Sequence, residues 1–241
     1  MKTSARFIPK SKGQKIKKPI QFFLVRFVGL FLLLIGLLFI PAGRLDWWEA
    51  WLFVLVYAIF IVVYLLIGLR KDPDQIIERS QVGENAKSWD RTILGIYSLL
   101  LLVMLVVAGL DAGRFRWAPV STALEILGWL GLCLAGGLIW WTASVNTFLS
   151  RQVRIQVERG HHTVTTGPYR YVHHPMYDGV ILFVIGIPLL LGAGWALLPA
   201  GLIAVLFVIR TALEDKTLKE ELGVYREYAD KVRYRLLPGI W

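Results

Sequence analysis

Cysteine is nearly absent from this chain of 241 residues, since Cys133 is the only one. A single thiol cannot form an internal disulfide, and it cannot build a zinc site from several thiolates. Cys133 lies within an apolar run, where a buried and unreactive thiol is the expected state. The chain also lacks internal repeats and low-complexity stretches, which speaks against repeat architectures.

Acidic residues are scarce as well, 17 against 27 lysines and arginines, and the formal net charge is +10. Such a charge can indicate nucleic-acid binding when it gathers on one folded face. Here the basic residues are spread over loops beside apolar runs, so we expect no nucleic-acid partner. Anionic lipid headgroups are the partner that this distribution favours.

Apolar residues, in contrast, make up 56% of the chain, and the mean hydropathy is +0.57. A helix needs about 20 apolar residues to cross the hydrocarbon of a bilayer. Four segments meet that length, residues 20–40, 47–69, 92–110 and 122–145. The first is too long for a signal peptide, and no small-residue cleavage site follows it before Pro41, so we expect it to be retained. The sequence therefore predicts an integral membrane protein.

Two shorter apolar runs follow, residues 180–191 and 195–209, joined by Gly192-Ala193-Gly194. We expect them to form a hairpin of two short helices. Short helices at membrane depth are tolerated where they line a cavity, which we favour over two tilted, ordinary spans. Beyond them, apolar residues recur with helical spacing up to Val232, which predicts an amphipathic helix that begins near Glu214. This helix could lie on the membrane surface or cover a pocket from the cytoplasmic side, and we favour the second because Glu214 begins it.

The predicted fold class is thus all-α: a polytopic membrane protein with four long transmembrane helices, a hairpin of short helices and a cytoplasmic amphipathic C-terminal helix. Lysine and arginine gather in residues 1–18, 70–91, 151–170 and 210–235, whereas the other loops hold only Arg44, Arg114 and Arg116. Because short cytoplasmic loops are enriched in these residues, both termini are predicted to be cytoplasmic.

The histidines give the clearest indication of a site. All four lie within fourteen positions between apolar runs, as His161, His162, His173 and His174. Glycines and prolines in residues 146–176 prevent one uninterrupted helix there, so turns expose backbone amides to a ligand. Titratable groups at the edge of the hydrocarbon are costly and usually serve a purpose. We expect a pocket here, and we divide the chain into a basic tail (1–19), a transmembrane region (20–145) and a functional half (146–241).

The run from Gly167 to Gly179 resembles the G-x-Y-x-x-x-R-H-P-x-Y-x-G signature of the isoprenylcysteine carboxyl methyltransferase family and its phospholipid methyltransferase relatives. Downstream, Arg210 followed by Glu214 and Asp215 is similar to that family's R-x-x-x-E-E motif, and a tyrosine-rich ending comes after it. The resemblance extends from about residue 146 to the end. It implies a membrane methyltransferase that binds S-adenosylmethionine in a cytoplasm-facing pocket and admits a lipid-like substrate from the bilayer.

Carried over by position, the resemblance also implies site residues. Cofactor contacts would come from Gln156, His161, His162, Thr163, Val164, Tyr169, His174, Pro175, Met176 and Tyr177. By their chemistry, the carboxylates of Glu214 and Asp215 would add a cofactor contact by pairing its ammonium. Arg210 matches the arginine that contacts the substrate's carboxylate in relatives, so it would position the acceptor here.

The chemistry of these residues is compatible with that role. Carboxylates can pair an ammonium, aromatic rings can face a sulfonium or adenine, and histidine nitrogens can bind adenine or a carboxylate. Transfer of a methyl group to an ionised carboxylate is an in-line displacement that needs no general base. An amine acceptor would first have to lose a proton, and His173 or His174 would be the base to test.

Other interpretations are open at this point. The histidines could cap turns at the membrane surface, and Arg210 with Glu214 could be an ordinary helix ion pair. A zinc site would have no cysteine and no clear carboxylate to complete it, so we expect no metal. For the function, the alternatives are N-methylation of an aminophospholipid, or a non-catalytic scaffold or carrier that retains the pocket.

Two positions depart from the family's pattern. His173 stands where relatives usually have arginine, which replaces a permanent charge by a side chain that is mostly neutral at pH 7 in water. Asp178 occupies a place that is commonly small or apolar, and Asp215 is one methylene shorter than the usual glutamate. We expect cofactor affinity or pH dependence to differ from that of relatives.

Overall fold

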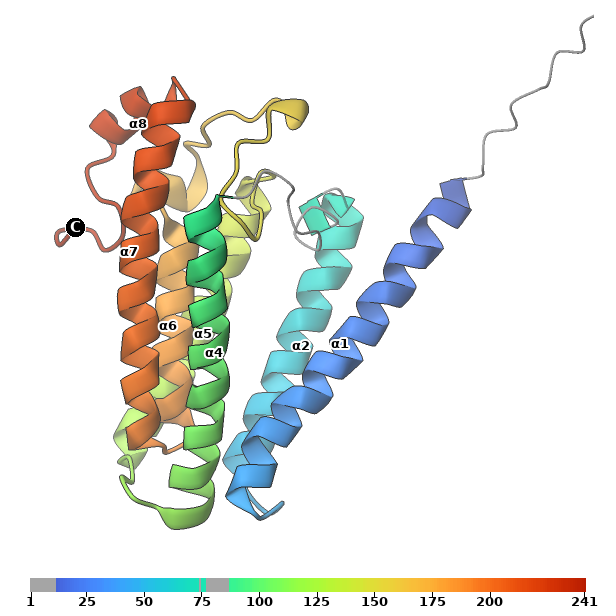
Figure 1. Cartoon of the computed structure of the whole chain (residues 1–241), viewed down its shortest axis with the longest axis vertical. Coiled ribbons are helices and arrows are strands. Elements are labelled where there is room, and N and C mark those ends of the chain that lie inside the picture. The colour runs from blue at the N-terminus through green and yellow to red at the C-terminus, as the bar shows by residue number, and fades with distance from the viewer. Residues whose placement is uncertain (1–11, 74, 77–86) are drawn as a thin grey trace, which may run out of the picture.

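The computed structural model describes residues 12–73, 75–76 and 87–241. Within these residues the protein consists of helices and turns, with two isolated β-bridges and no strand. The α-helices are α1 (Lys12–Ala42), α2 (Trp48–Lys71), α4 (Ser88–Ala108), α5 (Thr122–Val145), α6 (Pro175–Leu190), α7 (Leu197–Glu221) and α8 (Tyr225–Lys231). Helices α4 to α7 form a bundle, with α1 and α2 beside it and α8 across one end (Figure 1).

Four helical stretches are long and apolar enough to cross a membrane: Trp48–Lys71, Ser88–Phe115, Thr122–Val145 and Gly194–Glu221. The predicted all-α polytopic fold is therefore confirmed, and three of the stretches match predicted spans. The predicted first span falls in α1, whose described apolar part, Phe27–Ala42, is shorter. Of the predicted basic tail, residues 1–11 lie outside the described part of the chain, and residues 12–19 are already helical.

The predicted hairpin is correct in its first helix and wrong in its second. Helix α6 has 16 residues, but α7 has 25 and continues well past the predicted end at Ile209. The hydropathy falls after that residue because the chain turns polar, yet Arg210, Thr211 and Asp215 are buried against protein and the helix goes on. One helix therefore carries both the apolar span and the polar motif.

The predicted amphipathic C-terminal helix is also divided. Helix α7 ends at Glu221, and α8 begins at Tyr225 after a turn that contains Gly223. Glycine is among the poorest helix formers, which explains the break. Tyr225 and Tyr228 of α8 are both buried, so this short helix packs onto the end of the bundle.

Helices α5 and α6 cross at very short range because glycines face each other. A Cβ atom added at Gly128 would lie 2.5 Å from the backbone nitrogen of Leu190, and one at Gly186 would lie 3.1 Å from the carbonyl oxygen of Gly128. Small residues at a crossing let two membrane helices approach closely. This contact fixes α6, whose first residues belong to the histidine segment.

At the far end of the bundle, Asp111 links the loop before α5 to the loop before α7 through hydrogen bonds. It lies in a π-helical turn, Gly109–Phe115, that follows α4, and it is fully buried. Its two carboxylate oxygens accept the backbone N–H groups of Ala118 and Trp195, each at 2.8 Å. A buried carboxylate is stable there because both oxygens are hydrogen-bonded.

An apolar groove runs along one side of the molecule between α2, α5 and α6. It is lined by Val56, Tyr57, Ile59, Phe60, Val63, Tyr64, Ile67, Leu132, Cys133, Gly136, Gly137, Trp140 and Phe183. The prediction that Cys133 is buried is wrong, because the thiol is exposed in this groove. The residue lies within a span, but on a face of α5 that borders the groove.

Candidate functional site

The histidine segment crosses the end of the bundle as a series of turns. It contains two short 3₁₀ turns, Val157–Arg159 and Gly167–Arg170, and no long helix, as predicted. Gly160 and Gly167 have φ angles of +66° and +61°. Glycine adopts this left-handed backbone at little cost, which explains how the chain reverses at both positions.

A cavity opens beneath this segment, between it and the ends of α6 and α7. Ten of the thirteen predicted site residues line it: His161, His162, Thr163, Val164, Tyr169, His174, Met176, Tyr177, Arg210 and Glu214. Two stretches of sequence some thirty-five residues apart are thus brought to one cavity. The remaining three, Gln156, Pro175 and Asp215, do not line it.

One wall of the cavity is aromatic and was not predicted. Phe148 stacks on the ring of His161 at a centroid distance of 4.7 Å and meets the ring of His162 edge-on at 4.8 Å. Beside it, the side-chain amide of Asn146 donates to the hydroxyl oxygen of Tyr169 at 2.6 Å. Both residues precede the motif, and no pattern in the sequence separates them from ordinary residues at the end of a span.

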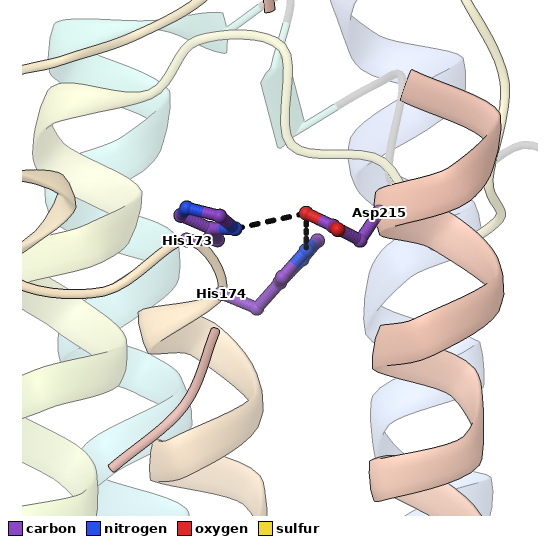
Figure 2. Close-up of side chains that lie close together, drawn as sticks. All are labelled: His173, His174 and Asp215. Atoms are coloured by element: carbon purple, nitrogen blue, oxygen red, sulfur yellow. Dashed lines mark hydrogen bonds and ion pairs between the residues drawn. The ribbon is translucent and has the colours of Figure 1, made fainter. Parts of the chain in front are cut away.

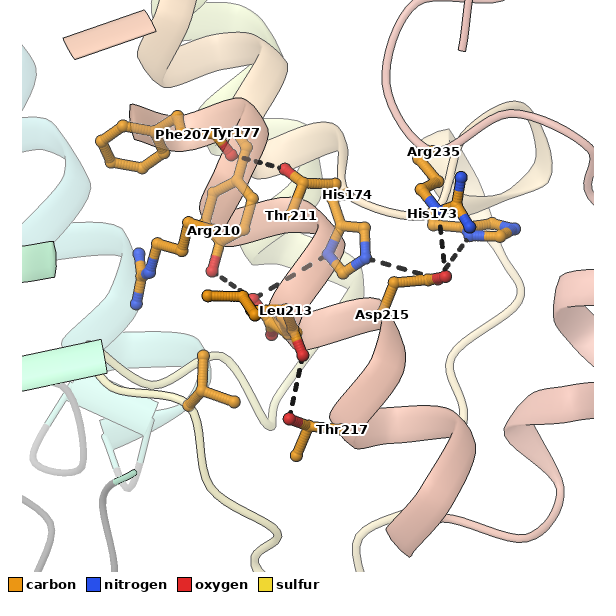
Figure 3. Close-up of polar contacts among 12 residues, drawn as sticks. His173, His174, Tyr177, Phe207, Arg210, Thr211, Leu213, Asp215, Thr217 and Arg235 are labelled. Atoms are coloured by element: carbon orange, nitrogen blue, oxygen red, sulfur yellow. Dashed lines mark hydrogen bonds and ion pairs between the residues drawn. The ribbon is translucent and has the colours of Figure 1, made fainter. Parts of the chain in front are cut away.

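The floor is formed by His174, Tyr177 and Glu214. The rings of His174 and Tyr177, both labelled in Figure 3, stack at 5.6 Å with an angle of 4°. The Tyr177 hydroxyl donates to Glu214. His174 Nδ1 lies 3.9 Å from Glu214 Oε2, and His174 Nε2 lies 3.8 Å from Asp215 Oδ1. Both distances exceed hydrogen-bonding range, so the buried His174 ring approaches two carboxylates without bonding to either.

Asp215 lies behind this floor as the centre of a hydrogen-bonded cluster (Figure 2). Its oxygen atoms accept from His173 Nδ1 at 2.8 Å, the Tyr225 hydroxyl at 2.9 Å, Lys219 Nζ at 2.9 Å and Arg235 Nε at 3.0 Å. The cluster joins α7 to the histidine segment, α8 and the C-terminal tail. Asp215 thus has protein partners on both oxygens, which indicates a structural role within the cluster instead of direct contact with a ligand.

Two buried tyrosines of α8, Tyr225 and Tyr228, pack against this cluster and donate hydrogen bonds. Tyr228 donates its hydroxyl to the carbonyl oxygen of Tyr169 at 2.7 Å. Burial raises the pKa of Tyr228, and the neighbouring Tyr169 raises it further. Burial and the charge of Asp215 likewise raise the pKa of Tyr225 far above its ordinary value. Both hydroxyls therefore stay protonated as donors across the physiological pH range.

Arg210 reaches the cavity from α7 while being held from two other elements. Its Nε donates to Asp90 Oδ1 at 2.8 Å, and Nη2 donates to the carbonyl oxygen of Arg151 at 3.0 Å. Its guanidinium carbon lies 4.9 Å from the centre of the Tyr177 ring. Asp90 on α4 is fully buried, and its other oxygen accepts the backbone N–H of Val153 at 2.8 Å.

Asp90 was not predicted as a site residue, although its position in the sequence gives an indication. An acid at the start of an apolar span is costly unless paired, so it marks a contact. What the sequence does not give is the partner, because Arg210 lies 120 residues further along the chain.

Two other predicted cofactor residues, Gln156 and Pro175, contact protein instead of lining the cavity. Gln156 is fully buried, and its side chain bonds to the carbonyl oxygen of Phe148 and to Arg159. Pro175 is the first residue of α6, a position where a missing N–H costs nothing. Both support the shape of the cavity from outside it.

His173, His174 and Asp215 bring three metal-ligand atoms within 4.8 Å of one another. The sequence analysis did not predict that Asp215 lies close enough to both histidines to be a third metal ligand. Both of its oxygens, however, already accept hydrogen bonds, and Lys219 and Arg235 place two cations on one of them. Such surroundings favour a hydrogen-bonded cluster over a metal site.

Comparison with known proteins points to one family. The model of the isoprenylcysteine carboxyl methyltransferase (ICMT) family matches residues 129–220. The protein-S-isoprenylcysteine O-methyltransferase of Saccharomyces cerevisiae is 28% identical over 193 residues, which cover 75% of this chain and 76% of that protein. The uncharacterized protein YpbQ of Bacillus subtilis is 33% identical over 129 residues, or 53% of this chain and 70% of that protein.

The apolar helices and these matches define a membrane methyltransferase as the class of protein. More narrowly, the chain belongs to the isoprenylcysteine carboxyl methyltransferase family. The matched region contains the histidine segment and the Arg210–Asp215 motif, whereas Asp90 and α8 lie outside it.

Proposed function

We propose that this protein transfers a methyl group from S-adenosylmethionine, bound in the cavity, to a carboxylate on a lipid-like molecule. One observation carries the proposal. Thr163 Oγ1, a buried polar atom of a cavity residue, has no hydrogen-bond partner among the described residues. Buried polar groups are almost always hydrogen-bonded, so this atom fits a polar ligand.

The cavity residues suit the separate parts of the cofactor. Glu214 uses one oxygen for the Tyr177 hydroxyl, and its carboxylate can pair an ammonium. Tyr169 and Tyr177 offer aromatic rings for a cation or a flat base. When bound, S-adenosylmethionine supplies a methyl group on a positively charged sulfonium. Asp215 would act indirectly, by holding His173 and α8 in place behind the cavity.

Arg210 is the residue that would hold the acceptor's carboxylate. Guanidinium has five N–H donors, and among the described residues Asp90 and Arg151 engage two of those of Arg210. The others can bind a carboxylate, and the two engaged donors keep the group in a fixed position. Because an acceptor carboxylate is already ionised at neutral pH, the chain's contribution is alignment and exclusion of water.

The apolar groove suits the chain of such an acceptor. Its walls are almost wholly apolar, and they include Phe183 of α6. Phe183 lies less than two helical turns from Tyr177, which lines the cavity. A molecule with its chain in the groove could therefore bring its carboxylate toward Arg210 from the bilayer side.

The proposal also covers the division of the chain into regions and its orientation in the membrane. Residues 146–241 would form the cofactor-binding half, completed by Asp90 from α4. The cavity end of the bundle, where α8 lies and α4 begins, would face the cytoplasm (Figure 1). The lysine- and arginine-rich segments of the sequence support this orientation through the enrichment of these residues in cytoplasmic loops.

Methyl transfer tests the proposal. Purified protein in bilayers receives S-adenosylmethionine with a labelled methyl group and an S-isoprenylcysteine acceptor. We expect label in a base-labile ester that releases methanol. Arg210→Gln should reduce transfer by about 100-fold, because a charged hydrogen-bond donor is lost. Arg226→Gln, an exposed arginine on α8, is the matched control and should transfer normally.

The other outcomes separate the alternatives. Base-stable label on an aminophospholipid would replace the carboxylate acceptor by an amine. Cofactor binding without transfer to any lipid would indicate a carrier. Equal loss of transfer in Arg210→Gln and Arg226→Gln would contradict the assignment of Arg210.

A further inference from the structure

The ring of His173 lies between two hydrogen-bond acceptors. Its Nδ1 is 2.8 Å from Asp215 Oδ1, and its Nε2 is 2.6 Å from the carbonyl oxygen of Val232. The side chain is only 3% exposed, so water does not mediate either contact. Both partners lie within hydrogen-bonding distance of the ring itself.

A neutral imidazole carries one N–H donor and one lone pair. Whichever nitrogen holds the proton, the other would then point its lone pair at an oxygen lone pair. Asp215 cannot supply the missing proton, because Lys219 and Arg235 on its second oxygen keep it ionised. The carbonyl of Val232 has no proton to give. Only an imidazolium makes hydrogen bonds on both sides.

We propose that His173 is held as an imidazolium and is a positioning residue for the cavity. The charged and titratable groups around it come from every neighbouring element: Asp215 and Lys219 on α7, Tyr225 and Tyr228 on α8, Arg235 on the tail and His174 on its own turn. Lys219 and Arg235 are partly exposed, with side-chain exposures of 35% and 36%, so solvent weakens their repulsion of the buried ring.

The imidazolium fixes the turn that presents His174. The backbone N–H groups of His173 and His174 donate to the carbonyl oxygens of Tyr234 and Arg235, each at 2.9 Å. Ring and backbone together thus clamp the turn between α7 and the C-terminal tail (Figure 3). The next residues along the chain begin α6 and include Tyr177 of the cavity floor. The link from this clamp to cofactor binding rests on the proposed function.

The charge makes the clamp dependent on pH. In an unfolded chain, the imidazolium form of histidine loses one proton and becomes neutral at about pH 6.5. A fold that needs this proton is stabilised below that pH and loses stability as the pH rises above it. Arginine at the same position would keep both donors at all these pH values.

The charge state can be measured directly. The chain has only four histidines, so selective ¹⁵N labelling gives at most four rings in a nuclear magnetic resonance spectrum. We expect one ring to be doubly protonated at about pH 7.5, where free histidine is mostly neutral, and to disappear in His173→Gln. Four neutral rings under these conditions would overturn the proposal.

Stability and binding test the consequence in the full-length protein in bilayers. From about pH 6 to about pH 8.5 we expect the melting temperature of the wild type to fall. We expect the fall to be smaller in His173→Arg and equally small, but from a lower starting value, in His173→Gln. His162→Gln removes an exposed histidine of the same segment and should keep the wild-type slope. A wild-type slope in His173→Gln would overturn the proposal.

Binding of labelled S-adenosylmethionine is the final measurement. We expect His173→Gln to weaken it about tenfold, the loss that one charged hydrogen bond causes, and His173→Arg to restore it at high pH. Full affinity in a stable His173→Gln would remove the positioning role. The spectrum and the melting temperatures involve no methyl transfer. A protein with the imidazolium but no cofactor binding would contradict the proposed function and leave the charge state of His173 established.

Discussion

At the scale of single residues, the site is built from charges that are paired inside the protein. Arg210 pairs with Asp90, and Asp215 with His173, Lys219 and Arg235. The sequence predicted that the histidine segment and the Arg210 motif meet at one cavity, because the resemblance linked them. It did not give the partners, since ion pairs between distant residues have no local pattern.

The pair Asp90–Arg210 leads to a prediction about catalysis. In Asp90→Asn the guanidinium loses its charged anchor, so we expect methyl transfer to fall by about 10- to 100-fold while cofactor binding is retained. In an Arg210→Gln background the same change should have no further effect, because both changes remove one interaction. Transfer rates per folded molecule and equilibrium binding measure these quantities.

Asp111→Asn is the matched control for this prediction. Asp111 is equally buried and hydrogen-bonded, but at the far end of the bundle. We expect it to lower the melting temperature and leave the transfer rate of folded protein unchanged. Additive losses in the Asp90→Asn, Arg210→Gln double variant would show that Asp90 does not act through Arg210.

At the scale of helices, the sequence predicted spans well and helix ends poorly. Apolar length identified α2, α4 and α5, because hydrocarbon sets that length directly. It failed for α7, where the helix continues into polar residues that face protein instead of water. The break before α8 was missed because regular apolar spacing masked Gly223. Hydropathy reports where the membrane ends, whereas packing and turn residues decide where the helix ends.

The close crossing of α5 and α6 gives a prediction for stability. Alanine at Gly128 would place a Cβ atom 2.5 Å from the Leu190 nitrogen, so the helices would have to separate. Such overpacking costs about 1–3 kcal/mol, and we expect a lower melting temperature. Gly131→Ala on the same helix meets nothing within 4 Å and should not lower it. Equal melting temperatures for the two variants would mean that the crossing is not tightly packed.

At the scale of the whole molecule, two openings of different chemistry lie near each other. The cavity at the end of the bundle is lined by polar and aromatic groups, and the groove on its side is apolar. This arrangement suits a polar cofactor that arrives from water and an acceptor that arrives from the bilayer. Composition predicted the membrane, but it could not separate groove-lining leucines and valines from those that contact lipid.

Cys133 allows the groove to be tested without added reporters, because it is the only cysteine and it lines the groove. We expect a membrane-permeant maleimide to react with it, and an isoprenoid thioether to slow the reaction. S-adenosylmethionine alone should have no effect. As a control, Leu134→Cys in a Cys133→Ser background places the thiol on an exposed neighbour outside the groove lining. Equal protection of both thiols would indicate a nonspecific effect of the lipid.

The central claim is that residues of the histidine segment and of α7 bind S-adenosylmethionine together. Equilibrium binding of the labelled cofactor to purified wild type, His174→Ala and Glu214→Ala tests it most directly, with Glu220→Ala, an exposed acid on the same helix, as control. We predict saturable binding by wild type and by the control, and affinities at least about tenfold weaker in the two cavity variants. Unchanged binding in both cavity variants would contradict the account.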